Sequence, residues 1–100
     1  MIRHVVVFRL AADDPADRQR DATEIRRRLE ALVDVVPGLR GLEVRPDLGV
    51  EGHWDLALVT LHDTGDDLAV YAADPRHREV IAYCDTVVAE RAVVDSDLEV

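Results

Sequence analysis

The sequence predicts an α+β fold of the ferredoxin-like type, in which one sheet of four antiparallel strands carries helices on one face. Two observations predict it. Segments with the alternation of strands and segments with helical spacing follow one another in the order β-α-β-β-α-α-β. The chain of 100 residues is 48% hydrophobic but only 4% aromatic, which suits a single small domain over residues 1–100 with a core of valine, leucine and alanine.

The first strand is expected at Ile2–Leu10, because side chains that alternate along a strand point to opposite faces of the sheet. One face carries Ile2, His4, Val6, Phe8 and Leu10, and the other carries Arg3, Val5, Val7 and Arg9. Both faces contain valine, so we expect each face to be covered at least in its middle.

The first helix is expected to begin at Asp14-Pro15, because an aspartate N-cap followed by proline favours helix initiation. Apolar residues then recur at helical spacing. They are Ala22, Ile25, Leu29, Leu32, Val33 and Val36. Pro37-Gly38 is expected to end this helix.

Two strands follow the first helix. One starts at Gly41 in the segment GLEVRPDL, and the other lies in HWDLALVTLH between His53 and His62. The second strand alternates Trp54, Leu56, Leu58 and Thr60 with Ala57, Val59 and Leu61. Gly49 and Gly52 flank the turn between the two strands.

Two further helices and a last strand complete the pattern. Asp63-Thr64 can cap a helix that runs through Tyr71. Asp74-Pro75 repeats the cap and proline signal and begins a third helix. The apolar stripe of that helix is Val80, Ile81, Cys84, Val87 and Val88. The segment RAVVDSDLEV, from Arg91, is expected to be the final strand.

This arrangement leaves one face of the sheet without helices, and that face would expose a large apolar patch. The patch consists of Val5, Val7, Ala57, Val59 and Leu61. Two such sheets packed face to face would bury it, so we expect a homodimer with twofold symmetry.

The composition argues against several classes of partner. A formal net charge of −9 disfavours binding to nucleic acid. The densest basic run, Arg26–Arg28, lies between Glu24 and Glu30 and is typical of a solvated helix face with ion pairs. With a single cysteine, Cys84, and no apolar run long enough for a signal peptide or a membrane span, we expect a cytoplasmic protein.

The candidate functional residues are polar groups at predicted strand and helix ends. In a ferredoxin-like sheet the first and last strands are neighbours, so Asp95 could accept a hydrogen bond from His4 and fix its tautomer. The same contact would also suit a purely structural pair. The break at Asp74-Pro75 could let Tyr71 and His77 lean over one cavity. Alternatively, Tyr71 is a core-edge residue with its hydroxyl in water, and His77 is an exposed histidine whose pKa the helix dipole lowers.

Five segments together resemble the stress-responsive dimeric α/β-barrel (Dabb) family. They are I-x-H-V-V-x-F, VPGLRGLEV, WDLALV, YAADPRH and the closing VVD, in register from Ile2 to about Asp95. The resemblance implies a ferredoxin-like protomer and a dimer whose sheets form a barrel. In one branch of the family, the plant polyketide cyclases related to olivetolic acid cyclase, a poly-β-keto chain is closed by aldol condensation.

That branch implies a set of site residues here. Its histidines, tyrosine and last-strand aspartate match His4, Tyr71, His77 and Asp95. His77 would remove a proton next to a carbonyl, Tyr71 would donate to the enolate oxygen, and His4 with Asp95 would bind or protonate a second oxygen. The lining of such a pocket would be Val6, Phe8, Leu56 and Leu58. No metal or organic cofactor is needed.

Two features depart from the family. This chain has aspartate at Asp74, where the family often has a histidine before the proline, and its first helix is rich in arginine and alanine where the cyclases carry aromatic residues. The second departure argues against a long-chain substrate. The spacing of His53 and His62 fits no metal motif, and the acidic tail resembles a cation site only in composition. A non-catalytic dimer with a structural, stress-related or ligand-binding role is the alternative.

Overall fold

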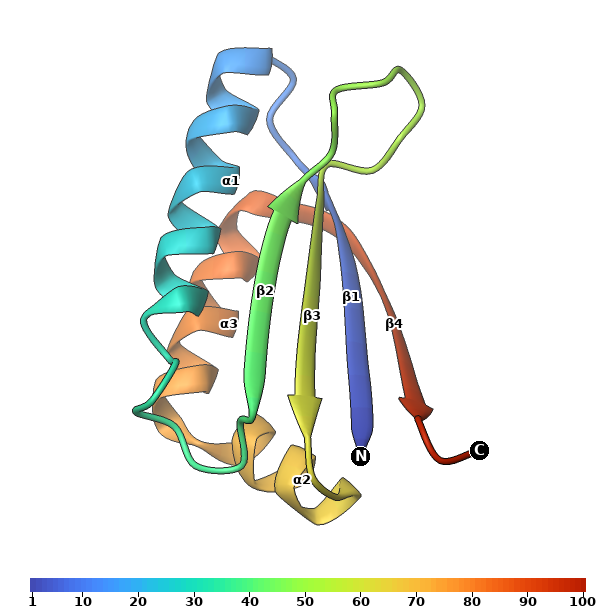
Figure 1. Ribbon diagram of the computed structural model, residues 1–100. Coiled ribbons are helices and arrows are strands. Elements are labelled where there is room, and N and C mark those ends of the chain that lie inside the picture. Colours follow the sequence, from blue (N-terminus) through green and yellow to red (C-terminus); the bar gives the residue numbers. More distant parts are fainter.

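The computed structural model describes residues 1–100 and has the predicted ferredoxin-like architecture (Figure 1). Its elements are β1 (Ile2–Leu10), α1 (Pro15–Glu30), β2 (Gly41–Pro46), β3 (Leu56–His62), α2 (Gly65–Ala73), α3 (Pro75–Val87) and β4 (Val88–Asp97). The sheet order is β2-β3-β1-β4, and every neighbouring pair is antiparallel. Figure 1 shows α1 and α3 on one side of the sheet and α2 at the end where β3 stops.

The core lies between the sheet and the helices. Along β3 the helix-facing side chains are buried and the alternate ones are half-buried, as the alternation predicts. The buried apolar residues are Val6, Phe8, Leu10, Ile25, Leu29, Leu32, Val36, Val44, Leu56, Leu58, Tyr71, Val80 and Cys84. No helix has the length and hydropathy that crossing a bilayer would require.

All three helices begin with a side-chain cap. Asp14 accepts a hydrogen bond from the amide of Ala16 at 2.8 Å, and Asp74 accepts one from Arg76 at 2.8 Å, each just before a proline. Thr64 caps α2 through the amide of Asp67. These caps satisfy backbone donors that have no partner within the helix. The predicted helix starts are confirmed.

Two predicted boundaries are wrong. Helix α1 ends at Glu30 rather than at Pro37-Gly38, and turns that include a left-handed Asp34 (φ 66°) follow it. The apolar spacing continued past the true end because Leu32 and Val36 pack into the core from these turns. Strand β4 begins at Val88, directly after α3 and earlier than predicted.

The arginine run of α1 is paired with acidic side chains, as expected. Arg27 and Arg28 both donate to Glu24, and Arg26 donates to Glu30. The hydrogen bonds from Arg27 and Arg28 lower the pKa of Glu24 to about 2. These charges therefore neutralise one another on the surface of the helix.

Strand β1 occupies the middle of the sheet and fixes the register of the polar residues. His4 lies opposite Thr60 of β3 on one side and opposite Asp95 of β4 on the other. Ile2 lies opposite His62. Directly opposite residues point to the same face, so all of these side chains lie on the helix side of the sheet.

Candidate functional site

Four rings from four different elements form a continuous cluster at one end of the sheet. The ring centroids of His4 (β1) and His62 (β3) are 6.5 Å apart, those of His62 and Tyr71 (α2) are 5.1 Å apart, and those of Tyr71 and His77 (α3) are 4.4 Å apart. Three of these rings belong to the residues singled out in the sequence, and His62 connects them.

His4 pairs with Asp95 as the strand topology predicted. The distance between Nδ1 of His4 and Oδ1 of Asp95 is 2.5 Å. A carboxylate only accepts, so Nδ1 carries the proton and Nε2 is unprotonated in the neutral ring. The pair lies at the edge of the core, because the side chain of Asp95 on the edge strand β4 is 47% exposed.

Tyr71 is buried, and its hydroxyl has no hydrogen-bond partner. The sequence left open a core-edge position with the hydroxyl in water, and that alternative is wrong, because α2 directs the ring against His62. Burial raises the pKa of Tyr71 above its usual range, so the hydroxyl stays protonated at neutral pH. An unsatisfied buried donor is rare and calls for an explanation.

His77 is half-buried against Tyr71 rather than exposed in the first turn of α3. Its Nδ1 donates to the carbonyl of Ala72 at 3.1 Å, which leaves Nε2 unprotonated in the neutral ring. Burial is the main reason why the pKa of His77 is lowered, and the charge of His4 acts in the same direction. The break between α2 and α3 at Asp74 brings the two rings together.

His62 is the member of the cluster that the sequence reasoning missed. It is fully buried; its Nδ1 donates to the carbonyl of Gly38 at 2.5 Å, and its Nε2 lies 2.8 Å from the hydroxyl of Thr60. Burial lowers the pKa of His62. The alternation of β3 indicates that His62 is buried, because it puts His62 on the same face as Thr60 and Leu58.

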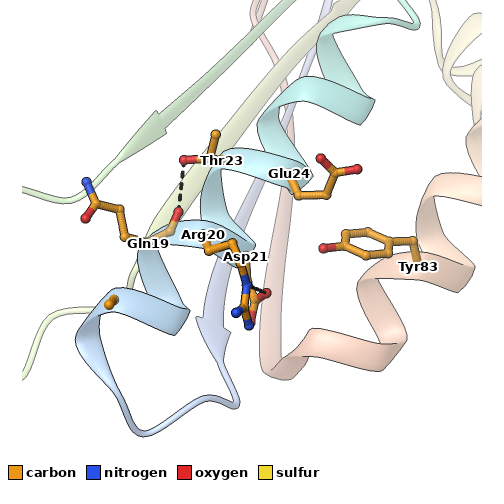
Figure 2. Close-up of a pocket in the computed structure, with 7 residues that line it drawn as sticks. Gln19, Arg20, Asp21, Thr23, Glu24 and Tyr83 are labelled. Atoms are coloured by element: carbon orange, nitrogen blue, oxygen red, sulfur yellow. Dashed lines mark hydrogen bonds and ion pairs between the residues drawn. The ribbon is translucent and has the colours of Figure 1, made fainter.

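Two surface pockets lie elsewhere in the molecule. One, of about 680 Å³, lies beside α1 and α3, where Tyr83 points toward Asp21 and Glu24 (Figure 2). The other, of about 550 Å³, lies under the loop between β2 and β3. None of the ring cluster lines either pocket.

The four residues expected to line a pocket are all buried in the core. They are Val6, Phe8, Leu56 and Leu58. Only Leu56 also lines one of these pockets, the one under the loop.

The remaining histidine and the acidic tail have other partners. His53 lies 2.9 Å from Asp47, and Glu99 pairs with the N-terminal amine. Asp97 accepts from the amide of Glu99. No group of three or more His, Cys, Asp or Glu side chains converges in a way that could hold a metal ion.

Comparison with known sequences identifies the family. Residues 2–98 match the sequence profile of the stress responsive A/B barrel domain, Dabb. The chain belongs to the Dabb family. No match to this Dabb protein was found among curated protein sequences.

Solved structures with the same fold include proteins described as dimeric. A dimeric protein of unknown function from Bacteroides fragilis has 26% identity and a TM-score of 0.88, over 97% of this chain and 95% of that one. A dimeric ferredoxin-like protein from Thermobifida fusca has 28% identity and a TM-score of 0.78, over 97% and 90%. A hydroxynitrile lyase from Passiflora edulis shares the fold, with 16% identity and a TM-score of 0.78 over 95% and 90%.

Proposed function

We propose that this Dabb protein is a cofactor-independent enzyme that transfers protons on a small carbonyl compound, as a cyclase or isomerase does. The observation that carries the proposal is the buried Tyr71, whose hydroxyl has no partner and whose ring packs on the ring of His77. A preorganised donor without a protein acceptor is suited to an oxygen on which charge develops during a reaction.

The proposed chemistry begins with the base. The unprotonated Nε2 of His77 would take a proton from the carbon next to a carbonyl, and the electron pair of the C–H bond would move onto the carbonyl oxygen as an enolate. Tyr71 would donate a hydrogen bond to that oxygen. The enolate carbon would then attack a second carbonyl in a cyclisation. In an isomerisation of an unsaturated ketone, the γ-carbon of the conjugated dienolate would instead take the proton back from His77. In the first case His4 would act as the imidazolium, with its Nδ1 proton held by Asp95, and would deliver the proton of Nε2 to the new alkoxide. His77 would then pass its proton back to Nε2 of His4 through water.

The electrostatics of the cluster support these roles. Burial lowers the pKa of His77, so its free base is available at neutral pH. Burial raises the pKa of Tyr71, so it remains a donor rather than a phenolate. A base with a lowered pKa beside a donor with a raised pKa is the pattern expected of an acid–base pair.

We also propose that the protein works as a homodimer through the bare face of the sheet. Val5 lies between Val59 of β3 and Val94 of β4 in one apolar row across that face. None of the helices of the chain lies on this side (Figure 1). Two solved structures of the same fold are described as dimeric, which supports the same arrangement here.

A non-catalytic, stress-related or ligand-binding dimer is the second candidate. It is favoured by the burial of Tyr71, which is 1% exposed and lines neither of the two pockets described above. On this alternative the contact between His4 and Asp95 joins β1 to β4, and His77 packs without reacting.

Proton exchange into deuterated water separates the two candidates. Acetophenone and a 3-oxoacyl thioester are suitable probes, with the loss of their α-proton signals followed by NMR. We expect the wild-type protein to accelerate exchange, and His77→Ala to lower that rate by about a hundredfold while the fold is kept. His53→Ala, a histidine on the loop between β2 and β3, is the control and keeps the rate. No acceleration by the wild type with either probe would favour the non-catalytic dimer.

A further inference from the structure

His62 has no ring nitrogen left for a ligand. Nδ1–H is bound to the carbonyl of Gly38, and the Thr60 hydroxyl donates to Nε2 in the neutral tautomer. The side chain is fully buried. His62 therefore takes no direct part in proton transfer, unlike His4 and His77, whose Nε2 atoms accept no hydrogen bond within the protein.

The carbonyl that His62 holds belongs to a turn that packs directly on α2. Gly38 has a left-handed φ of +85°, and a Cβ atom placed there would lie 2.3 Å from the carbonyl oxygen of Asp67 and 3.4 Å from the amide nitrogen of Tyr71. The backbone of the turn and the backbone of α2 are thus in close contact. The hydrogen bond from His62 holds this turn to β3. Because the turn packs on the backbone of α2, it also limits the position of that helix.

The second route to Tyr71 is direct. The ring of His62 packs on the ring of Tyr71, with centroids 5.1 Å apart and planes inclined by 48°. The Tyr71 hydroxyl makes no hydrogen bond that could fix the orientation of its own ring. The orientation is therefore set by the neighbouring rings and by the backbone of α2, and His62 contributes to both.

We propose that His62 is the positioning residue of the candidate site, and that it holds the Tyr71 hydroxyl where the enolate oxygen of the proposed reaction would form. This role rests on the proposed function. A hydrogen-bond donor must lie within a few tenths of an ångström of its productive position to be effective. Loosening one supporting contact is enough to reduce a rate, since a misplacement of about 1 Å can cost about a hundredfold.

The test compares His62→Leu with His62→Gln, whose amide offers both a donor and an acceptor. The readouts are the NMR titration of the His77 ring and the exchange rate of the ketone probe, both in protein shown to be folded by circular dichroism. We expect His62→Leu to move the His77 titration toward its ordinary value and to lower the rate about tenfold or more. Compared with His62→Leu, His62→Gln should restore part of the His77 titration shift and part of the exchange rate. The control is His53→Leu, which leaves both readouts unchanged.

Each outcome decides the proposal. If His62 were merely structural, His62→Leu would lower the melting temperature but leave the exchange rate of the folded protein as it is. The His77 titration would then move only by the loss of the nearby imidazole, whose charge lowers the pKa of His77. Should His62→Leu fail to fold, Thr60→Val removes only one hydrogen bond of the ring and is expected to shift both readouts in the same direction. An unchanged titration in Thr60→Val then overturns the proposal. If the wild type shows no exchange, the proposed function fails, whereas the His77 titration in Thr60→Val, which keeps the His62 imidazole, still decides whether His62 positions Tyr71.

Discussion

A buried hydroxyl without a hydrogen bond costs a protein about 1–3 kcal/mol, because water solvates that group in the unfolded chain. At the scale of single residues, Tyr71 bears this cost in a domain whose small size leaves a thin core. The pairing of His4 with Asp95 could be predicted from strand order alone. The buried hydroxyl of Tyr71 could not, because it depends on how α2 is rotated about its axis. The role of His62 could not be predicted either, because its contacts with Gly38 and Tyr71 join residues that are distant in the sequence.

Tyr71→Phe is expected to separate stability from activity. Removing the unsatisfied hydroxyl raises the free energy of unfolding by about 1 kcal/mol, because only the solvation cost is lost. The same change lowers the exchange rate of the ketone probe. Urea unfolding measures the first effect. The control is Tyr83→Phe, which should not raise the free energy of unfolding, because Tyr83 is only half-buried beside the pocket in Figure 2. A clear loss of stability in Tyr71→Phe would mean that the hydroxyl has a partner after all.

The histidines predict how stability depends on pH. Burial lowers the pKa values of His62 and His77 in the folded protein, so the unfolded chain binds more protons once the pH falls to about 6.5. The free energy of unfolding should therefore decrease as the pH falls through this value and level off below the pKa values of the folded state. The pKa of Asp74, about 2, lies far below this window. Urea unfolding between pH 8 and about 5 measures the slope, and His62→Gln should reduce it. An equal slope in that variant would contradict the expectation for His62.

At the scale of elements, the starts of the helices were predictable and one helix end was not. A cap such as Asp14 or Asp74 accepts a hydrogen bond from the amide two residues later. The interaction is local, so it can be predicted from the sequence. The end of α1 was hidden because Leu32 and Val36 keep the apolar spacing although they lie in turns. The turn after α1 then reaches Gly38, whose contact with α2 involves residues far along the chain.

Gly38→Ala is expected to destabilise the protein more than Gly52→Ala does. Both glycines have a positive φ, +85° for Gly38 and +84° for Gly52, so each substitution costs about 1 kcal/mol or more in backbone strain. Nothing lies within 4 Å of a Cβ atom at Gly52. A Cβ atom at Gly38 would overlap the carbonyl of Asp67, and this overlap adds about 1–3 kcal/mol to the loss of stability. Thermal unfolding of the two variants gives the comparison. Equal losses would show that α2 moves aside at little cost.

At the scale of the whole molecule, the sequence accounted for the layers and the family but not for the pockets. Alternation along β1 and β3 divides the helix-facing core from a second apolar face, and this division determines the architecture. The pockets depend on the volumes of a few side chains and on a loop. Val6 and Phe8, expected to line a cavity, are buried in the core and line neither of the two pockets described.

The second apolar face provides the last prediction. Val59 is half-buried at the middle of this face, opposite Val5 on one side and Glu43 on the other, so arginine is tolerated there in a single protomer. In a face-to-face dimer the same arginine would be buried in the interface, at a cost of several kcal/mol for each charge (about 20 kcal/mol in the idealised limit). We therefore expect Val59→Arg to convert the dimer into folded monomers.

Size-exclusion chromatography with light scattering measures this change, and circular dichroism checks the fold. The control is Val70→Arg, because Val70 lies on α2 away from the bare sheet face and is 48% exposed. That variant should remain dimeric. A dimer that survives Val59→Arg would place the interface on another surface, and a monomeric wild type would remove the dimer itself. In either case the apolar row of Val5, Val59 and Val94 would need a different partner, because a patch of this kind is seldom left in water.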